Sequence, residues 1–90
     1  MSKNDLIALL ASVICDLRAD EKMRGEDFLH SIIDDYQKVI DLLVADDLSV
    51  NIIRTSPRQY LEIYSDYESP MLEKMDRAQY EVQAFIGVHP

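Results

Sequence analysis

Apolar side chains recur every three or four residues over most of the chain, which is the spacing of one face of an α-helix. The first such stretch predicts a helix over residues 3–17, capped by Ser2 or Asn4. Its apolar stripe is broad enough to be buried on two sides and consists of Leu6, Ile7, Leu9, Leu10, Val13, Ile14 and Leu17. Residues 18–25 are nearly all charged and end in Gly25, so they are predicted to form a solvated turn with room for one further helical turn.

The clearest helical period lies in residues 26–44, where apolar positions alternate in steps of three and four. This stretch is predicted to be the central core helix, with a buried seam of Leu29, Ile32, Ile33, Tyr36, Val39, Ile40 and Leu43. Glu26 and Asp27 come at its predicted N-terminus, where the positive end of the helix dipole stabilises carboxylates.

Residues 46–55 are the least regular part of the chain. Leu48, Val50 and Ile52 alternate with polar residues, which is the period of a short strand. An isolated strand has nothing to pair with in a helical chain. We therefore expect a short extended connector over residues 47–55 that packs Val50, Ile52 and Ile53 on the bundle. A strand that pairs across a dimer is the alternative.

Ser56 is followed by proline, and this pair is a start signal for a helix. Ser56 is predicted to be the N-cap, with Gln59 reaching back to complete a capping box. The short helix that begins here is predicted to stop before Ser69, because the residue before a proline is disfavoured in the helical region. Its large side chains are Tyr60, Leu61, Ile63, Tyr64 and Tyr67.

A second Ser-Pro pair, Ser69 and Pro70, predicts the start of a last helix. This helix is predicted to run to Ile86 and to end at Gly87, with a buried face of Met71, Met75, Ala78, Val82 and Phe85. The four stretches together predict an all-α fold, a small bundle of three longer helices and one short helix. We expect residues 1–90 to form a single acidic helical domain.

Charge and cysteine content narrow the class of protein. The 90 residues carry 17 Asp and Glu against 9 Lys and Arg, a net charge of −8. This charge repels nucleic acid and anionic membranes and favours encounter with a basic protein. Cys15 is the only cysteine and is predicted to be a small buried side chain, which favours a reducing compartment. With no signal peptide and no membrane-spanning run, we expect a cytoplasmic protein that contacts neither nucleic acid nor membrane.

The acidic excess centres on the predicted core helix and its flanks. Five aspartates of this region are candidates to face a surface rich in Lys and Arg, namely Asp34, Asp35, Asp41, Asp46 and Asp47. The nucleic-acid groove of a nuclease or effector is a surface of that kind. The alternative is that the negative charge only keeps the protein soluble.

Three tyrosines alternate with carboxylates along the predicted short helix. Tyr60, Tyr64 and Tyr67 are spaced by four and then three residues, which places their rings on one helix face. Tyrosine is frequent in binding hot spots because it offers a large rigid apolar body with a polar tip. The alternative is that the rings close the core, and we expect at least one of them to lie outside it.

The segment Tyr64-Ser65-Asp66-Tyr67-Glu68-Ser69-Pro70 joins tyrosines, acidic residues and the Ser-Pro pair that opens the last helix. In this order it resembles the four-helix immunity proteins that neutralise nuclease bacteriocins. The resemblance implies an acidic inhibitor that binds a basic toxin through carboxylates of its second helix and tyrosines of its third. The adjacent tyrosine pair of that family is absent here. The same architecture and charge suit antitoxins and phage-encoded inhibitors of host enzymes.

Candidate metal and catalytic motifs are incomplete. Asp27 and His30 have the spacing of half a carboxylate-bridged di-metal site, and Asp34 lies one turn further on. The second histidine motif that such a site needs is absent, because the only other histidine is His89 in the terminal tail. Glu73-x-x-Asp76 likewise lacks the paired Glu-x-x-Glu of helical Mg²⁺ enzymes. We expect no metal, no cofactor and no enzyme activity.

The sequence thus predicts a non-enzymatic protein-binding module, an acidic inhibitor of a basic, nucleic-acid-handling protein. The residues expected to contact this partner are Asp34, Asp35, Asp41, Tyr60, Tyr64 and Asp66. The main alternative is a helical homo-oligomeric scaffold or adaptor, since a chain of 90 residues builds a thin core and a homodimer would enlarge it. A small metal-dependent hydrolase is the third class.

Overall fold

The computed structural model describes residues 2–88 of the chain. These residues form four helices and no strand, which confirms the predicted all-α bundle of three longer helices and one short helix. The helices are α1 (Lys3–Arg24), α2 (His30–Val44), α3 (Ser56–Tyr64) and α4 (Pro70–Val88). The molecule is elongated, with principal extents of 38 × 20 × 18 Å.

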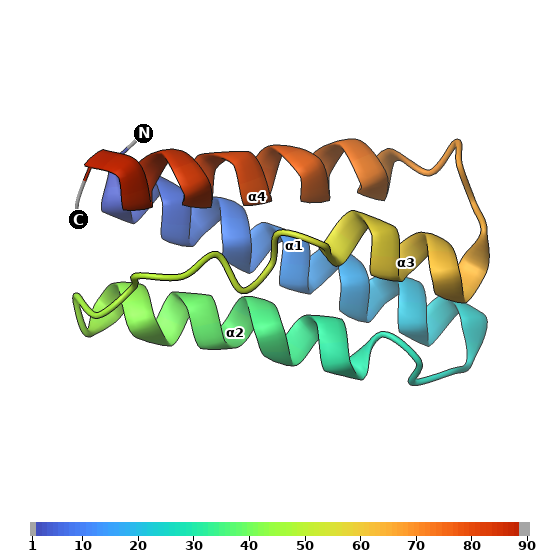
Figure 1. Ribbon diagram of the computed structural model, residues 1–90. Coiled ribbons are helices and arrows are strands. Elements are labelled where there is room, and N and C mark those ends of the chain that lie inside the picture. Colours follow the sequence, from blue (N-terminus) through green and yellow to red (C-terminus); the bar gives the residue numbers. More distant parts are fainter. Residues whose placement is uncertain (1, 89–90) are drawn as a thin grey trace.

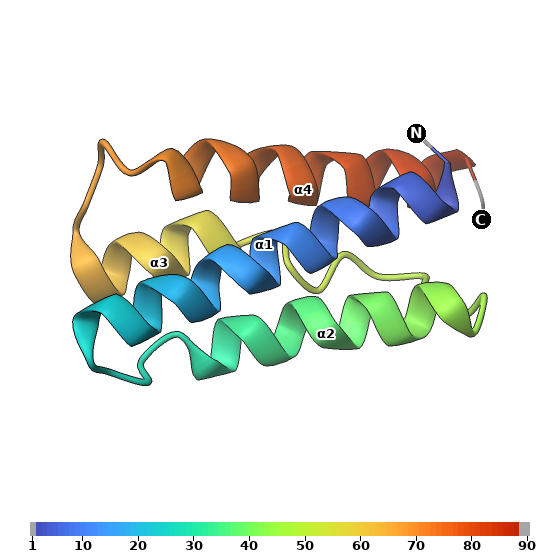
Figure 2. The same ribbon diagram turned by 180° about the vertical axis from the view of Figure 1, so that it is seen from behind.

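In the view of Figure 1, α1 is the rear helix of the bundle and lies between α4 on one side and α2 on the other, as Figure 2 shows from behind. The front is closed by α3 together with the connector that precedes it (Figure 1). The α1–α2 and α3–α4 connections lie at one end of the bundle, and the first and last described residues lie at the other. Contacts of α1 with both α2 and α4 agree with the broad apolar stripe predicted for it.

The first helix begins as predicted and ends later. The Ser2 hydroxyl accepts the Asp5 backbone N–H at 3.2 Å, so Ser2 is the N-cap. The helix continues to Arg24. The prediction for residues 18–25 allowed one further helical turn, and beyond that turn it was wrong except at Gly25. Charged residues such as Glu, Lys and Arg are good helix formers, and an Asp20–Arg24 pair stabilises the last turn. Gly25 ends the helix in the left-handed conformation, with φ of 68°.

The second helix begins at His30, four residues later than predicted. Glu26 and Asp27 therefore lie in the connection before it, exposed, and not in its first turn. The predicted seam is otherwise confirmed, because Leu29, Ile32, Ile33, Tyr36, Val39 and Leu43 are all buried. They belong to one hydrophobic core that also takes in residues from α1, α3 and α4.

The connector between α2 and α3 is not a strand. Leu48 and Ile53 are buried and Ile52 is half-buried on the core, but Val50 is 63% exposed, so the expectation that it packs was wrong. The side-chain amide of Asn51 donates to the Gln79 carbonyl of α4 at 3.0 Å. One amide and three apolar residues therefore hold the connector across the open side of the bundle.

The third helix has a different cap from the one predicted. Thr55 is its N-cap, and the Gln59 side chain donates to the Thr55 hydroxyl at 3.2 Å. The Ser56 hydroxyl instead points into the core, where it lies 2.7 Å from the hydroxyl of Tyr36. The helix ends at Tyr64, and Ser65 takes the left-handed conformation.

The fourth helix begins as predicted, with the Ser69 hydroxyl accepting the Met71 N–H at 3.2 Å. It continues through Gly87 to Val88, so Gly87 does not end it. The predicted buried face is confirmed for Met71, Met75, Ala78 and Val82, and Phe85 is half-buried.

We predict that Tyr36→Phe lowers the free energy of unfolding by about 1–2 kcal/mol, because it leaves the buried Ser56 hydroxyl without its partner. Adding Ser56→Ala to Tyr36→Phe should restore part of this loss, since both ends of the pair are then apolar. Urea unfolding of the two single variants and the double variant measures the coupling. Tyr80→Phe, at a position 67% exposed, is the control and should change stability by less than about 0.5 kcal/mol.

Replacing each of the two glycines by alanine should change the stability of the protein in opposite directions. Gly25→Ala should destabilise by about 1 kcal/mol, because a Cβ is strained at φ of +68°. Gly87→Ala should stabilise, by at most about 1 kcal/mol, because Gly87 lies in α4 with open space where the Cβ would stand. Thermal melts of both variants measure the direction of each change. An increase in melting temperature for Gly25→Ala would contradict the left-handed C-cap at Gly25.

Candidate functional site

Two of the six predicted partner residues, Tyr64 and Asp66, lie beside Arg24. The Arg24 Nε donates to Asp20 Oδ1 at 3.0 Å, and the guanidinium carbon lies 3.8 Å from the centroid of the Tyr64 ring. A terminal nitrogen of Arg24 lies 4.0 Å from Asp66 Oδ2. The pKa of Arg24 is raised, first by its hydrogen bond to Asp20. Arg24 therefore joins α1, α3 and the α3–α4 connection in one polar cluster, which also includes Tyr60 and which we call the Arg24 cluster.

Tyr60 is a core residue. Its side chain is 1% exposed, and its hydroxyl donates to Asp20 Oδ2 at 2.7 Å. Its ring meets the Tyr64 ring edge to face at 5.4 Å between centroids. Burial raises the pKa of Tyr60, with Asp20 raising it further. The interior position removes Tyr60 from the predicted contact surface, because a partner cannot reach the ring while α3 stays packed.

Tyr64 is half-buried, between the core and the surface. Burial raises the pKa of its hydroxyl, and the charge of Glu26 adds to this effect. The hydroxyl oxygen is buried and makes no hydrogen bond within the described residues. The Tyr64 ring thus packs beneath the Arg24 guanidinium, and the residue is only partly exposed.

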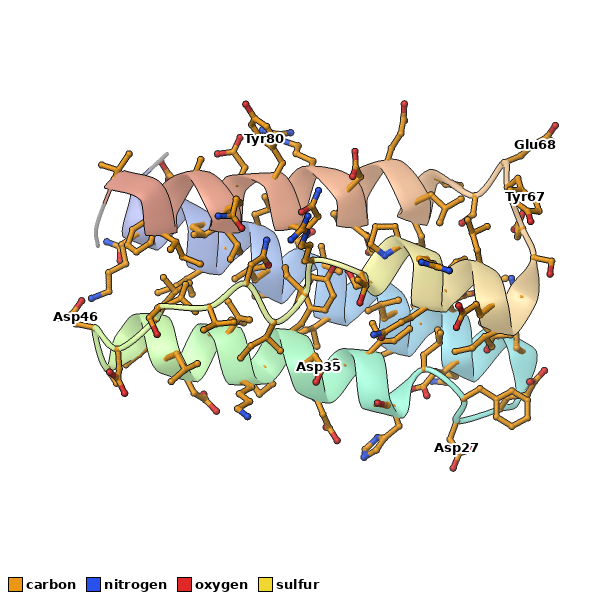
Figure 3. The ribbon with its side chains drawn as sticks, viewed as in Figure 1. Asp27, Asp35, Asp46, Tyr67, Glu68 and Tyr80 are labelled. Atoms are coloured by element: carbon orange, nitrogen blue, oxygen red, sulfur yellow. The ribbon has the colours of Figure 1, made fainter. Side chains whose placement is uncertain are left out.

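The three predicted aspartates of α2 do not share one face. Asp34 and Asp41 are exposed; Asp34 lies 3.4 Å from the His30 ring, and Asp41 accepts the Gln37 amide at 3.1 Å. Asp35 is half-buried, and burial raises its pKa, an effect that Lys38 partly opposes. In Figure 3 Asp35 lies near the middle of α2, far from Tyr67 along the bundle. Neighbouring positions on a helix point in different directions, so Asp35 is partly covered while Asp34 is exposed.

Exposed apolar side chains gather at the end of the bundle where two connections meet. We call this the loop end and define it as residues 20–30 and 62–69. Half of the large apolar side chains exposed in residues 2–88 belong to it, namely Met23 at 87%, Phe28 at 61%, Ile63 at 37% and Tyr67 at 76%. Figure 3 places Asp27 and Tyr67 at this end and Asp46 at the opposite one. Helix periodicity did not identify Met23 and Phe28, although an aromatic residue inside a charged stretch was a usable signal.

The loop end also carries much of the negative charge of the molecule. Its two segments hold seven of the 17 carboxylates and two of the nine Lys and Arg, a net charge of −5 out of −8. Asp27, Glu26 and Glu68 are exposed there. Aromatic residues and methionine are enriched in protein interfaces, whereas Asp and Glu are depleted from them, and the rim of an interface is polar.

Two expectations concern chemistry rather than docking. Within residues 2–88, no group of three or more His, Cys, Asp or Glu could hold a metal ion, and His30 and Asp34 form an exposed pair. His89 lies outside the described residues. Cys15 is exposed on α1, so the prediction that it is buried was wrong; Val13, Ile14 and Leu17 fill the buried face around it.

Each helix within residues 2–88 is too short or too polar to cross a bilayer. Searches with the chain find no matching family model, no matching curated protein and no matching solved structure. The resemblance of residues 64–70 to immunity proteins therefore gains no support from these comparisons.

We predict that Asp35→Asn raises the free energy of unfolding at pH 7. Burial raises the folded-state pKa of Asp35, so the ionised carboxylate is less favourable in the folded state than in the unfolded chain. That destabilisation is present above the folded pKa and is relieved as the pH falls through it. The gain over the natural protein should therefore vanish near pH 3, which chemical unfolding at several pH values would measure.

The control for this prediction is Asp47→Asn, which makes the same change in net charge at an exposed position. It reports how much stability comes only from reducing the negative charge. A gain at pH 7 that is equal in both variants would mean that burial of Asp35 contributes nothing.

Proposed function

We propose that this protein is a non-enzymatic binding protein that docks a basic protein through its loop end and blocks that protein's work on nucleic acid. What supports this function is the combination of four exposed apolar side chains with a net charge of −5 in the same two short segments. Buried aromatic anchors supply most of the affinity of an interface, and complementary charge supplies encounter rate and partner choice. The target class is a nuclease or effector with a basic groove, and a cytoplasmic location suits it.

The exposed rings of the loop end and the carboxylates of α2 would contribute to binding in different ways. Phe28 and Tyr67 are the anchors, because their rings are exposed and lose little rotamer freedom on binding. Asp34 and Asp41 stand on α2, outside the loop end, and extend the negative field along the molecule. Such outlying charges steer a basic partner and chiefly affect the association rate and its dependence on salt.

A helical homo-oligomer is the second candidate function. The exposed face of α1 carries small side chains, Ala8, Ala11, Cys15 and Ala19, which would allow a second helix to approach closely. Light scattering of the pure protein tests this candidate. A stable oligomer that is insensitive to salt would favour the scaffold over the inhibitor.

The inhibitor function is tested by a photo-cross-linking amino acid placed at Tyr67 or at Tyr80 in the native cell. Both positions are exposed, at 76% and 67%, but Tyr80 lies on α4 away from the loop end (Figure 3). We expect position 67 to capture a basic, nucleic-acid-handling protein and position 80 to capture none of it. The purified chain should then inhibit the captured protein in a nucleic-acid assay.

In that assay Tyr67→Ala should weaken inhibition about tenfold or more, as loss of an aromatic anchor does, and Tyr80→Ala should not. Asp34→Asn with Asp41→Asn should slow association, most of all at low salt. Capture of the same proteins from both positions, or capture of a partner whose activity the chain leaves unchanged, would contradict the proposed function.

A further inference from the structure

The three methionines within residues 2–88 differ greatly in exposure. Met23, in the last turn of α1, is 87% exposed, whereas Met71 and Met75 on α4 are 9% and 0% exposed. Met23 and Met71 nevertheless line the same hollow of about 290 Å³, between the later turns of α1 and the start of α4. Of two thioethers that border one hollow, one is therefore open to solvent and the other is covered.

Met23 belongs to the loop end and is the most exposed of its large apolar side chains. Apart from Ala19, it is the only apolar residue in the charged stretch 18–24. It lies outside the hydrophobic core, which includes Met71 and Met75. A chemical change at the Met23 sulfur therefore alters the surface proposed for docking and leaves the core unchanged.

We propose that Met23 is a site of selective and reversible oxidation by peroxides, and that this oxidation weakens docking at the loop end. The second part rests on the proposed function. The Met23 sulfur attacks one oxygen of hydrogen peroxide, so that an S–O bond forms and the O–O bond breaks. The proton of the transferred hydroxyl passes to the departing oxygen, which leaves as water. The sulfur loses two electrons and the peroxide gains them, and methionine sulfoxide reductases reverse the step with thiol electrons.

The selectivity follows from access to the sulfur. A peroxide meets the Met23 sulfur directly, whereas it reaches Met75 only when the fold opens locally. The effect on docking follows from polarity, because a sulfoxide is a polar group that must lose its water when an interface covers it. Oxidation of Met23 thus acts on binding rather than on folding.

The first part is tested without any partner, by treating the natural chain with hydrogen peroxide and measuring the oxygen added to each methionine by peptide mass mapping. Met23 should react at least about tenfold faster than Met75, with Met71 between them. In urea the three should react alike, because the unfolded chain exposes them all. Reductases should remove the oxygen from Met23, and the singly oxidised chain should keep its melting temperature. Equal rates in the folded chain, or unfolding on oxidation of Met23, would overturn the proposed site.

The effect on docking is measured in the Cys15→Ser background, because the exposed thiol also reacts with peroxide. The chain is oxidised, freed of peroxide and mixed with the protein captured at position 67. Its affinity should fall about tenfold, the scale of one methionine side chain lost from an interface, and reductases should restore it.

Two leucine variants show which methionine is responsible. Peroxide treatment should leave the affinity of Met23→Leu at its own starting value, whereas Met71→Leu should lose affinity as its parent does. An oxidised chain that binds as tightly as before, or an equal loss in Met23→Leu, would overturn the effect on docking. If position 67 captures no basic protein, the proposed function fails and the effect on docking falls with it, while the oxidation rates still decide the modification site.

Discussion

The bundle depends on α1 being apolar on two sides. Its buried residues contact α2 on one side and α4 on the other, and of the three longer helices within residues 2–88 only α1 lies against both of the others. Because α3 is short, α3 and the connector together fill the place of a fourth long helix. Leu48 and Ile53 close the core where no helix covers it. Without the double-sided burial of α1, α2 and α4 would be joined only through α3 and the connector.

Two buried hydroxyl groups then fix how α3 sits on this frame. Tyr36 of α2 meets Ser56 at the start of α3, and Tyr60 of α3 meets Asp20 of α1. Each pair joins elements far apart in sequence, and a buried polar group left without a partner would cost more free energy than the pair contributes. The Tyr60 contact also holds Asp20 in the position where it receives Arg24. The Arg24 cluster is therefore a consequence of the packing of α3, and the loop end takes its shape from it.

The sequence predicted those features of the fold that follow from the helical spacing of apolar residues. The seams of α2 and α4 and the helix starts at Ser2 and Ser69 agree with the structure, because alternating steps of three and four residues define a face directly. The charged residues 18–24 were predicted to form a solvated turn because they carry no apolar period and end at a glycine, although their residue types favour helix. The choice of Ser56 as a cap failed because its hydroxyl had a better partner 20 residues away in sequence, and no local pattern reveals such a partner.

The candidate site was harder to predict than the fold for a related reason. A tyrosine series at helical spacing has one face, but spacing alone leaves undetermined whether that face is turned inward. Here the helix ends between Tyr64 and Tyr67, so one series yields a core ring, a half-buried ring and an exposed ring. The exposed anchors instead lie in the connections, where periodicity carries no information and where binding residues are frequent.

The negative charge of the protein is unevenly distributed. Seven carboxylates at one end repel one another, and this self-repulsion destabilises the compact state. The structure offsets part of it, since Asp20 is held by Tyr60 and Arg24, and Arg24 also approaches Asp66. A surface that served only solubility would gain from spreading its charges and from covering Phe28 and Tyr67. The self-repulsion at the loop end costs stability, and that cost is understandable if the loop end meets a surface of opposite charge.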